Sequence, residues 1–391
     1  MQRRRVRRVI MAVPFWVLMA GIVMTSVGIG RYAYLVNIRS DQRMASYWAQ
    51  DSETFYRHMS VYGRGARPGG LNTPAVYINS NESLGRADIS SIRTTLQNFA
   101  DSGRRATGKG GLGADGRPVG WEDCFSSFLT AGIDTVPDVA GGSTMSFNST
   151  TEVIAVEGNF TAFHPMMFMS GGFLPEIPSD TRQIVLNDVL AWKFYKSYDV
   201  IGNKVKLWGE EFTVIGVVAE PSDRISLAAG TGEPRVYVYF SAMETLAPLT
   251  DPGTSAGNGT ASQGTTSSQT QAPDTPRPDM AILCYEAMLP ELVRGVAKND
   301  MSTALPNYTP ATPNYYVISN TGRFGILDTW KGVMPIGEAE AKYSGYEFPY
   351  WEKTAKLTSK HLFADEALAL GGVVVIAAGA VMTALRRHKM S

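Results

Sequence analysis

Apolar and polar residues alternate along KVKLWGEEFTV (residues 204–214), a pattern typical of two half-buried β-strands. Gly209 and Glu210 stand between the two runs. We predict that they form a two-residue hairpin loop, because glycine tolerates a positive φ at the first loop position. Such a loop pairs Leu207 with Phe212. The inward face of the hairpin then carries four apolar residues, namely Val205, Leu207, Phe212 and Val214.

Two other segments are apolar enough to cross a membrane. Residues 9–30 contain no charge over 22 positions, and residues 367–385 contain none over 19. As helices they would be about 33 Å and about 28 Å long, close to the thickness of a bilayer core. A cleaved signal peptide is the alternative for the first segment. Its apolar run is longer than that of a signal peptide, and no small-residue cleavage pattern precedes Arg31, so we predict two retained transmembrane helices.

Basic residues flank both segments on their outer ends. Those before the first segment are Arg3, Arg4, Arg5, Arg7 and Arg8, and those after the second are Arg386, Arg387 and Lys389. Positive residues accumulate on the cytoplasmic side of a membrane protein. We therefore predict that both termini are cytoplasmic and that residues 31–366 are extracytoplasmic, in the cell (plasma or inner) membrane.

Composition agrees with a membrane protein that carries a large external domain. Hydrophobic residues make up 44% of the chain and charged residues 18%, below the roughly 25% typical of soluble domains. The net charge is zero, so no nucleic-acid partner is expected. The apolar segments make the lipid membrane the expected partner.

Periodicity divides the external part into strands and helices. A stalk helix is predicted over residues 31–62, with apolar residues at helical spacing from Ile38 to Met59. Residues 250–279 are polar and of low complexity, and they are predicted to be a disordered insertion. Strands are predicted at residues 75–80, within 133–156, and at 183–187, 280–287 and 314–320. Further helices are predicted at residues 86–103, 188–197, 290–301 and 350–366.

The two cysteines, Cys124 and Cys284, both fall in the external part. A disulfide between them is one alternative in an oxidising compartment. Two separate buried thiols are the other, because the sequence does not place them within bonding distance.

Candidate chemistry is sparse. His164, Met166, Met167 and Met169 are soft ligands that suit Cu(I), but we interpret these methionines as core residues that fill an irregular gap, and predict no metal or cofactor.

The segment GRRATGKGG (residues 103–111) resembles a phosphate-binding loop. Gly110 stands where serine or threonine must hold Mg²⁺, so the chain is not expected to supply an ATPase. No residue pattern in the sequence argues for another enzyme activity.

Small residues occur within both apolar segments and offer faces for close helix packing. They are Gly21 and Gly28 in the first segment, and Ala367, Gly371, Ala380 and Ala384 in the second. No ionisable residue lies in either segment, so no ion path is predicted. We favour packing against a partner over plain anchoring.

The run from Gly171 to Val218 resembles the periplasmic core domain of MacB-type ABC transporter permeases. The residues that carry the resemblance are Gly171 and Gly172, Ile184 to Asn187, Leu190, Ala191 and Phe194, Ile201 and Gly202, and Gly209 to Val218. The resemblance implies an α+β, two-lobed extracytoplasmic domain: a βαβ-type lobe built from both ends, with a β-rich lobe inserted between them. The family's permeases place three further membrane helices after this domain, whereas one apolar segment follows here, so we interpret the chain as a shortened permease or an accessory subunit.

These expectations give one domain plan. It comprises a cytoplasmic basic N-terminus (1–8), a transmembrane helix (9–30), a stalk helix (31–62), the core domain (72–320, with the insertion 250–279), a connector and second stalk helix (321–366), a second transmembrane helix (367–385) and a cytoplasmic tail (386–391). The expected function is that of a non-catalytic component of a MacB/FtsX-type ABC transport or mechanotransmission system. The implied partners are a cytoplasmic ABC ATPase and another membrane subunit or a second copy. An extracytoplasmic ligand- or partner-binding sensor or scaffold is the alternative.

Overall fold

A computed structural model describes residues 2–48, 55–65, 76–103, 120–136, 147–248, 277–291, 293–309, 314–334 and 345–388. The chain divides into two compact units. A helical unit contains Met1–Gln42, Gly322–Ser344 and Trp351–Ser391, and a sheet unit contains Arg43–Thr321 and Gly345–Tyr350.

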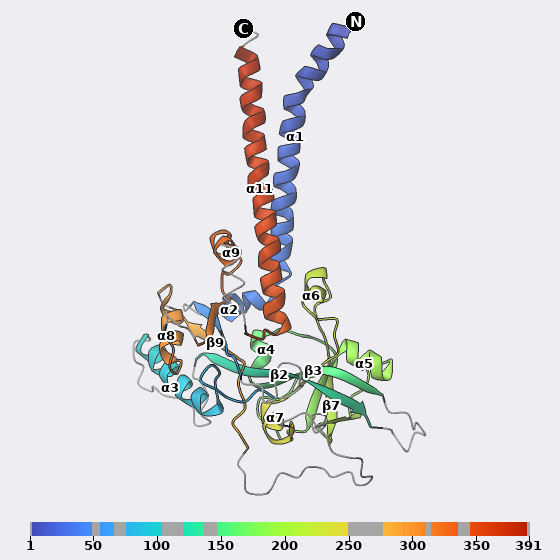
Figure 1. Ribbon diagram of the computed structural model, residues 1–391, viewed down its shortest axis with the longest axis vertical. Coiled ribbons are helices and arrows are strands. Elements are labelled where there is room, and N and C mark those ends of the chain that lie inside the picture. Colours follow the sequence, from blue (N-terminus) through green and yellow to red (C-terminus); the bar gives the residue numbers. More distant parts are fainter. Residues whose placement is uncertain are drawn as a thin grey trace, which may run out of the picture. The chain divides into compact units, whose positions relative to one another are not determined.

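The sheet unit is built on one mixed sheet (Figure 1). Its described strands are β1 (Tyr56–Tyr62), β2 (Glu122–Thr135), β3 (Asn148–Gly158), β4 (Met167–Gly171), β5 (Gln183–Asn187), β6 (Lys204–Leu207), β7 (Glu210–Ala219), β8 (Arg235–Tyr239), β9 (Cys284–Pro290) and β10 (Tyr316–Ser319). Their order is β10-β1-β9-β2-β3-β8-β5-β7-β4, and β6 pairs with both β2 and β7. The pairs β3–β8 and β5–β7 are parallel, and the others are antiparallel.

The α+β class is confirmed, and the two expected lobes share the sheet. Strands β1, β9 and β10 come from the two ends of the unit, and β1 pairs with both β9 and β10. Strands β3 to β8 come from the middle of the chain. The long strand β2 belongs to both groups, since it pairs with β9 at its start and with β6 at its end.

Short helices flank this sheet. In the sheet unit they are α2 (Met44–Trp48), α3 (Arg86–Gly103), α4 (Phe160–Phe163), α5 (Asp188–Tyr195), α6 (Arg224–Ala228), α7 (Phe240–Leu246) and α8 (Val296–Ala304). Helix α3 buries Ile89, Ile92 and Leu96, which recur at helical spacing. Arg93 of α3 donates two hydrogen bonds to the carboxylate of Asp123 on β2, at 2.7 and 2.9 Å, and so fastens the helix to the sheet.

The hairpin β6–β7 has the predicted faces but a different register. All four predicted inward side chains are fully buried. The loop consists of Trp208 and Gly209, whose φ values of 55° and 86° are both positive, as a type I′ turn requires. Leu207 therefore lies opposite Glu210 rather than Phe212. The register differs by two residues, which leaves the faces unchanged because side chains alternate with a period of two.

Three other element predictions are wrong in part. In place of the strand predicted at residues 75–80, the described residues contain only an isolated bridge between Ile78 and Met280. The predicted stalk helix over residues 31–62 ends early, because α1 (Gln2–Asn37) is followed by the 3₁₀ turn η1 (Asp41–Arg43), by α2 and then by strand β1. The helix predicted from Pro290 begins instead at Val296, since Pro290 is the last residue of β9. In contrast, the strand at 183–187 and the helix that follows it are confirmed, and the Asn187 side chain caps that helix by accepting a hydrogen bond from Leu190 N.

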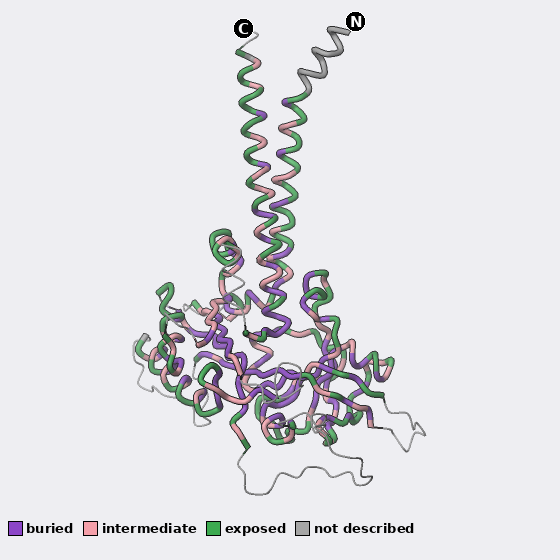
Figure 2. Tube along the Cα trace, viewed as in Figure 1, coloured by how far each residue is buried: buried purple, intermediate pink, exposed green. Residues whose placement is uncertain are grey.

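Among its described residues the helical unit contains α1, α9 (Ile326–Val333) and all of α11 (Tyr350–His388) except Tyr350, which belongs to the sheet unit. Figure 1 shows α1 and α11 side by side, and Figure 2 shows that their outward faces are largely exposed. Both helices are long and apolar enough to cross a membrane. Helix α11 is unbroken, so the expected second stalk helix and second span are one element.

The predicted insertion lies mostly outside the described residues. The structure describes its last three residues, 277–279, and two of them form hydrogen bonds. Arg277 donates hydrogen bonds to the carbonyls of Thr245 and Ala247, and Asp279 accepts one from Asn79. The prediction of disorder therefore does not apply to residues 277–279.

The buried face of the hairpin predicts the effect of mutation. Phe212→Ala should lower the free energy of unfolding by about 3–5 kcal/mol, through lost burial and a residual cavity. Lys206→Ala, on the exposed face of the same hairpin, should change it by less than about 0.5 kcal/mol. Urea unfolding of the full chain in detergent measures both. Equal losses for the two variants would contradict the assigned faces.

Candidate functional site

A buried arginine organises the centre of the sheet unit. Arg235, at the start of β8, is 1% exposed. Its guanidinium donates hydrogen bonds to Glu152 Oε2 at 2.7 Å, to the carboxylate of Glu220, and to the carbonyl of Gly230 at 3.0 Å. Burial alone would lower the pKa of Arg235, but the carboxylates of Glu220 and Glu152 outweigh it and hold the pKa above its ordinary value. The arginine is therefore a permanent buried cation with two acidic partners.

The strand register explains why these groups meet. Glu152 of β3 lies directly opposite Arg235 in the parallel pair β3–β8. Glu220 follows the last residue of β7, and its carboxylate also accepts a hydrogen bond from the Tyr237 hydroxyl at 2.9 Å.

The same cluster holds Tyr350, the first residue of α11. The Arg235 guanidinium lies 4.3 Å from the centroid of the Tyr350 ring, within the range of a cation–π contact. The Tyr237 and Tyr350 hydroxyls are 3.2 Å apart. We name Arg235, Glu152, Glu220, Tyr237 and Tyr350 the Arg235 cluster. Through Tyr350 this cluster is covalently continuous with the helix that contains the second apolar segment.

A second buried cluster surrounds Glu286 of β9, which is 1% exposed. Its carboxylate contacts His58 Nε2 at 2.9 Å and His164 Nε2 at 2.5 Å, and accepts a hydrogen bond from the Ser60 hydroxyl at 2.7 Å. Asn320 donates to Ser60 Oγ at 2.6 Å. Burial alone would raise the pKa of Glu286, but His164 and His58 outweigh it and hold the pKa well below its usual range.

This arrangement differs from that of a nucleophilic triad. In a triad the acid and the nucleophile face different nitrogens of the histidine. Here Ser60 Oγ and Glu286 Oε1 both face Nε2 of His58, and Ser60 is fully buried. Among the described residues no group of three or more His, Cys, Asp or Glu side chains is arranged to hold a metal ion. The geometry fits a charged core that joins β1, β9 and the turn after α4.

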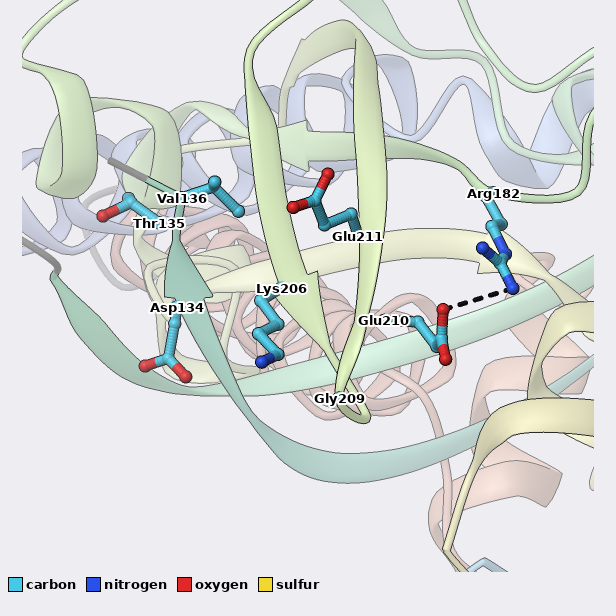
Figure 3. A pocket seen from close by; sticks show the side chains of 8 residues that line it. All are labelled: Asp134, Thr135, Val136, Arg182, Lys206, Gly209, Glu210 and Glu211. Carbon is cyan, nitrogen blue, oxygen red and sulfur yellow. Dashed lines mark ion pairs between the residues drawn. The ribbon is translucent and has the colours of Figure 1, made fainter. Parts of the chain in front are cut away.

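An open groove of about 660 Å³ lies between the end of β2 and the β6–β7 hairpin (Figure 3). It is lined by Asp134, Thr135, Val136, Arg182, Lys206, Gly209, Glu210 and Glu211. Arg182 forms an ion pair with Glu210 at 3.2 Å, and Glu211 forms one with Lys204 at 2.8 Å. The groove is open and lined mainly by polar residues of both charges, which suits contact with a polar partner surface better than enclosure of a small molecule.

The predicted soft-ligand residues do not come together. His164 is buried against Glu286, whereas Met167 and Met169 are 68% and 44% exposed and Met166 is half-buried. The prediction that these methionines fill the core is wrong. The physical reason is that nothing among the described residues packs over the faces of the edge strand β4: Met167 and Met169 on one face and Phe168 on the other are all exposed.

The two cysteines are buried on neighbouring strands, and neither forms a disulfide. Cys124 lies opposite Glu286, and Cys284 lies opposite Ser126, so the cysteines are diagonal neighbours. Diagonal neighbours are roughly 7–8 Å apart, which is further than a disulfide spans. Of the two alternatives, the structure contains separate thiols, and burial raises the pKa of Cys124 well above its usual value.

The small residues of the apolar segments divide into two groups. Gly21 and Gly28 face α11: a Cβ on Gly21 would lie 2.7 Å from Ile376, and one on Gly28 would lie 2.6 Å from the Asp365 carbonyl. On α11 the close contacts to α1 come from Gly372 and Gly379, which the sequence analysis missed although they share the seven-residue spacing of Gly21 and Gly28. The predicted small residues Ala367, Ala380 and Ala384 are exposed, and Gly371 is half-buried.

Comparison with known proteins identifies the domain. Residues 83–273 match the family described as MacB-like periplasmic core domain. The chain carries a MacB-like periplasmic core domain. Such domains occur in ABC transporter permease-type proteins. No curated protein matches the sequence.

Two solved structures are similar to this MacB-like chain. The periplasmic region of MacB from Actinobacillus actinomycetemcomitans is 10% identical, with a TM-score of 0.36, over 67% of this chain and 88% of that one. The extracellular domain of the noncanonic ABC-type transporter YknZ from Gram-positive bacteria is 12% identical, with a TM-score of 0.37, over 67% of this chain and 99% of that one.

The Arg235 cluster of the MacB-like domain generates a stability prediction. Arg235→Met should lower the free energy of unfolding by about 3–5 kcal/mol, because it leaves the buried Glu220 carboxylate and the partly buried Glu152 carboxylate without their cation. Arg182→Met is the matched control, since it removes an exposed ion pair worth at most about 1 kcal/mol. Urea unfolding of the full chain compares them. If Arg235→Met leaves the free energy of unfolding unchanged, the cluster does not stabilise this part of the sheet.

The Glu286 cluster predicts a pH dependence. Because the folded pKa of Glu286 lies below the unfolded value of about 4.3, its carboxylate stabilises the fold above that pH. This contribution is lost as the pH falls through the folded value. Glu286→Gln should therefore cost about 3–5 kcal/mol at pH 7 and flatten the loss of stability on acidification, whereas Glu210→Gln should retain the wild-type slope. Unfolding free energies between pH 7 and about 2.5 test this, and identical slopes for wild type and Glu286→Gln would contradict it.

Proposed function

We propose that the chain is a non-catalytic membrane component of a MacB/FtsX-type ABC transport or mechanotransmission system. The observation that carries the proposal is the position of the MacB-like domain between two helices that are long and apolar enough to cross a membrane. The external domain relays motion or contacts a partner or cargo. The ATPase resides in a separate cytoplasmic subunit, and the remaining membrane partner is another subunit or a second copy.

The proposed orientation places both termini in the cytoplasm. The arginines before the first apolar segment and the basic residues after the second support it through the positive-inside rule. In this orientation the sheet unit is extracytoplasmic, and a cytoplasmic ATPase reaches the chain through α1 and α11.

The proposed route of motion is α11. This helix runs without a break from Tyr350, which contacts Arg235 and Tyr237, to His388. A helix transmits a displacement along its axis because each backbone N–H is bonded to the carbonyl four residues earlier. A shift of the second span would therefore pull on the ring that covers the buried guanidinium.

The second candidate is an extracytoplasmic sensor or scaffold that binds a ligand or partner. The mixed-charge groove beside the β6–β7 hairpin favours it, because Lys206 and Asp134 line the groove from two paired strands and Lys206 is exposed to a polar partner. The two candidates differ in whether ATP hydrolysis moves the sheet unit.

The test breaks α11 outside the predicted span. Ala364 is exposed on α11, three residues before the apolar segment 367–385. Ala364→Pro removes a backbone donor and kinks the helix, at a cost of about 3 kcal/mol, whereas Ala364→Ser keeps the helix continuous. The full chain is reconstituted with the ABC ATPase that copurifies from its native membrane, with a spin label at Ile177→Cys, a 74% exposed position of the sheet unit.

ATP should change the label spectrum in wild type and in Ala364→Ser, and should leave it unchanged in Ala364→Pro. An ATP response that survives in Ala364→Pro would reject α11 as the route. No response in any variant, or no ATPase bound to the chain, would reject the transport proposal in favour of the sensor or scaffold.

A further inference from the structure

Helix α9 presents an apolar surface without a cover among the described residues. Ile326 and Leu327 of α9 and Met334, the C-cap residue that follows it, are 59%, 73% and 44% exposed. At 100° per residue, Leu327 and Met334 lie on one side of the helix, and Lys331 follows Leu327 by one turn on the edge of that side. Thr329, on another side, is 1% exposed and packs inward.

Contacts within the helical unit fix the level of α9 along the two long helices. The Tyr32 hydroxyl donates a hydrogen bond to the carbonyl of Phe324 at 2.6 Å. The rings of Trp330 and Phe363 are 4.8 Å apart, edge to face. Arg323 forms two hydrogen bonds with the carboxylate of Glu352, at 2.7 and 3.0 Å, and fastens the segment that leads into α9.

Two of these contacts lie next to the apolar segments. Tyr32 is two residues beyond the end of segment 9–30, which is about 3 Å along a helix, and Phe363 is four residues before segment 367–385, which is about 6 Å. The polar headgroup region extends several ångströms beyond the hydrocarbon core on each side. If segments 9–30 and 367–385 fill the core, Tyr32 and Phe363 lie at the headgroup level, and α9 is held there with them.

We propose that α9 is an interfacial helix that inserts Ile326, Leu327 and Met334 into the surface of the extracytoplasmic leaflet. Its apolar side meets the boundary between headgroups and acyl chains, where amphipathic helices lie and where tryptophan and tyrosine gather. Lys331 extends its ammonium group to the headgroups while its methylene stem covers apolar surface. The inference goes beyond the proposed transport role and rests on one part of it, the membrane-spanning arrangement of α1 and α11.

The charge of α9 determines which lipid headgroups the helix binds. Asp328 and Lys331 are the charged residues of the helix and offset each other. Apolar contact therefore dominates over attraction to anionic headgroups. The binding surface should accept neutral phosphatidylcholine as well as anionic lipid, with little dependence on salt.

The experiment measures depth in the membrane. The full chain carries Leu327→Cys labelled with the fluorophore bimane. It is reconstituted at one copy per phosphatidylcholine nanodisc. The nanodisc also contains lipids with a nitroxide quencher near the headgroup. The native thiols, Cys124 and Cys284, are buried and do not compete for the label. Asp328→Cys on the polar side of α9 is the matched control, and Val374→Cys, an exposed position inside segment 367–385, reports on the span and is read with deep nitroxides.

Quenching at Leu327→Cys should exceed that at Asp328→Cys by at least about twofold, and should persist when anionic lipid replaces part of the phosphatidylcholine. Equal quenching at the two α9 positions, with Val374→Cys quenched, would overturn the interfacial helix and leave the spans intact. No quenching at Val374→Cys would overturn the span, and the interfacial helix with it. Because each nanodisc holds one chain, contact with a second copy cannot account for the expected result.

Discussion

A charge buried in a protein needs an opposite charge within reach, and Arg235 imposes this requirement on the sheet unit. Its guanidinium is satisfied only when β3 presents Glu152, the end of β7 presents Glu220 and the segment after Gly345 presents Tyr350. Three parts of the chain that are far apart in sequence must therefore reach one point. An apolar core tolerates small changes of register and angle, but a guanidinium with two acidic partners has a narrow range of acceptable geometry.

The sequence predicted those elements whose structure depends on local features, such as capping residues and the spacing of apolar side chains. The strand at 183–187 and the helix after it were predictable because a short apolar run is followed by Asn187, a residue that caps helices. The buried face of the hairpin followed from alternation alone, and the two-residue error in register did not disturb it. The length of α11 followed from a predicted polar helix at 350–366 that leads directly into the apolar segment 367–385.

The incorrect and missed predictions concern residues whose structure depends on contacts with segments far away in the sequence. Phe55 and Met59 have helical spacing with the residues before them, yet residues 56–62 form a strand because β9 and β10 pair with it on both sides. Met167 and Met169 were interpreted as core residues, but the sheet ends at β4 and leaves them exposed. Glu286 and its histidines meet across β1, β9 and the turn after α4, which no spacing in the sequence indicates. Site prediction fails here because the interacting charges come from separate strands.

The pairing of β1 with β9 has a consequence for how the molecule is made. Tyr62 is hydrogen-bonded in the sheet opposite Cys284, and β1 lies between β9 and β10, both of which are synthesised late. During synthesis the first apolar helix leaves the ribosome long before the partners of β1 exist. Contacts between residues so distant in sequence make closure of the sheet slow, since loop entropy must be overcome before the pairing stabilises anything. During that interval β1 has neither β9 nor β10 beside it. Its unpaired backbone N–H and C=O groups can then pair with another chain, which leads to aggregation, or bind a chaperone, until β9 and β10 have been synthesised.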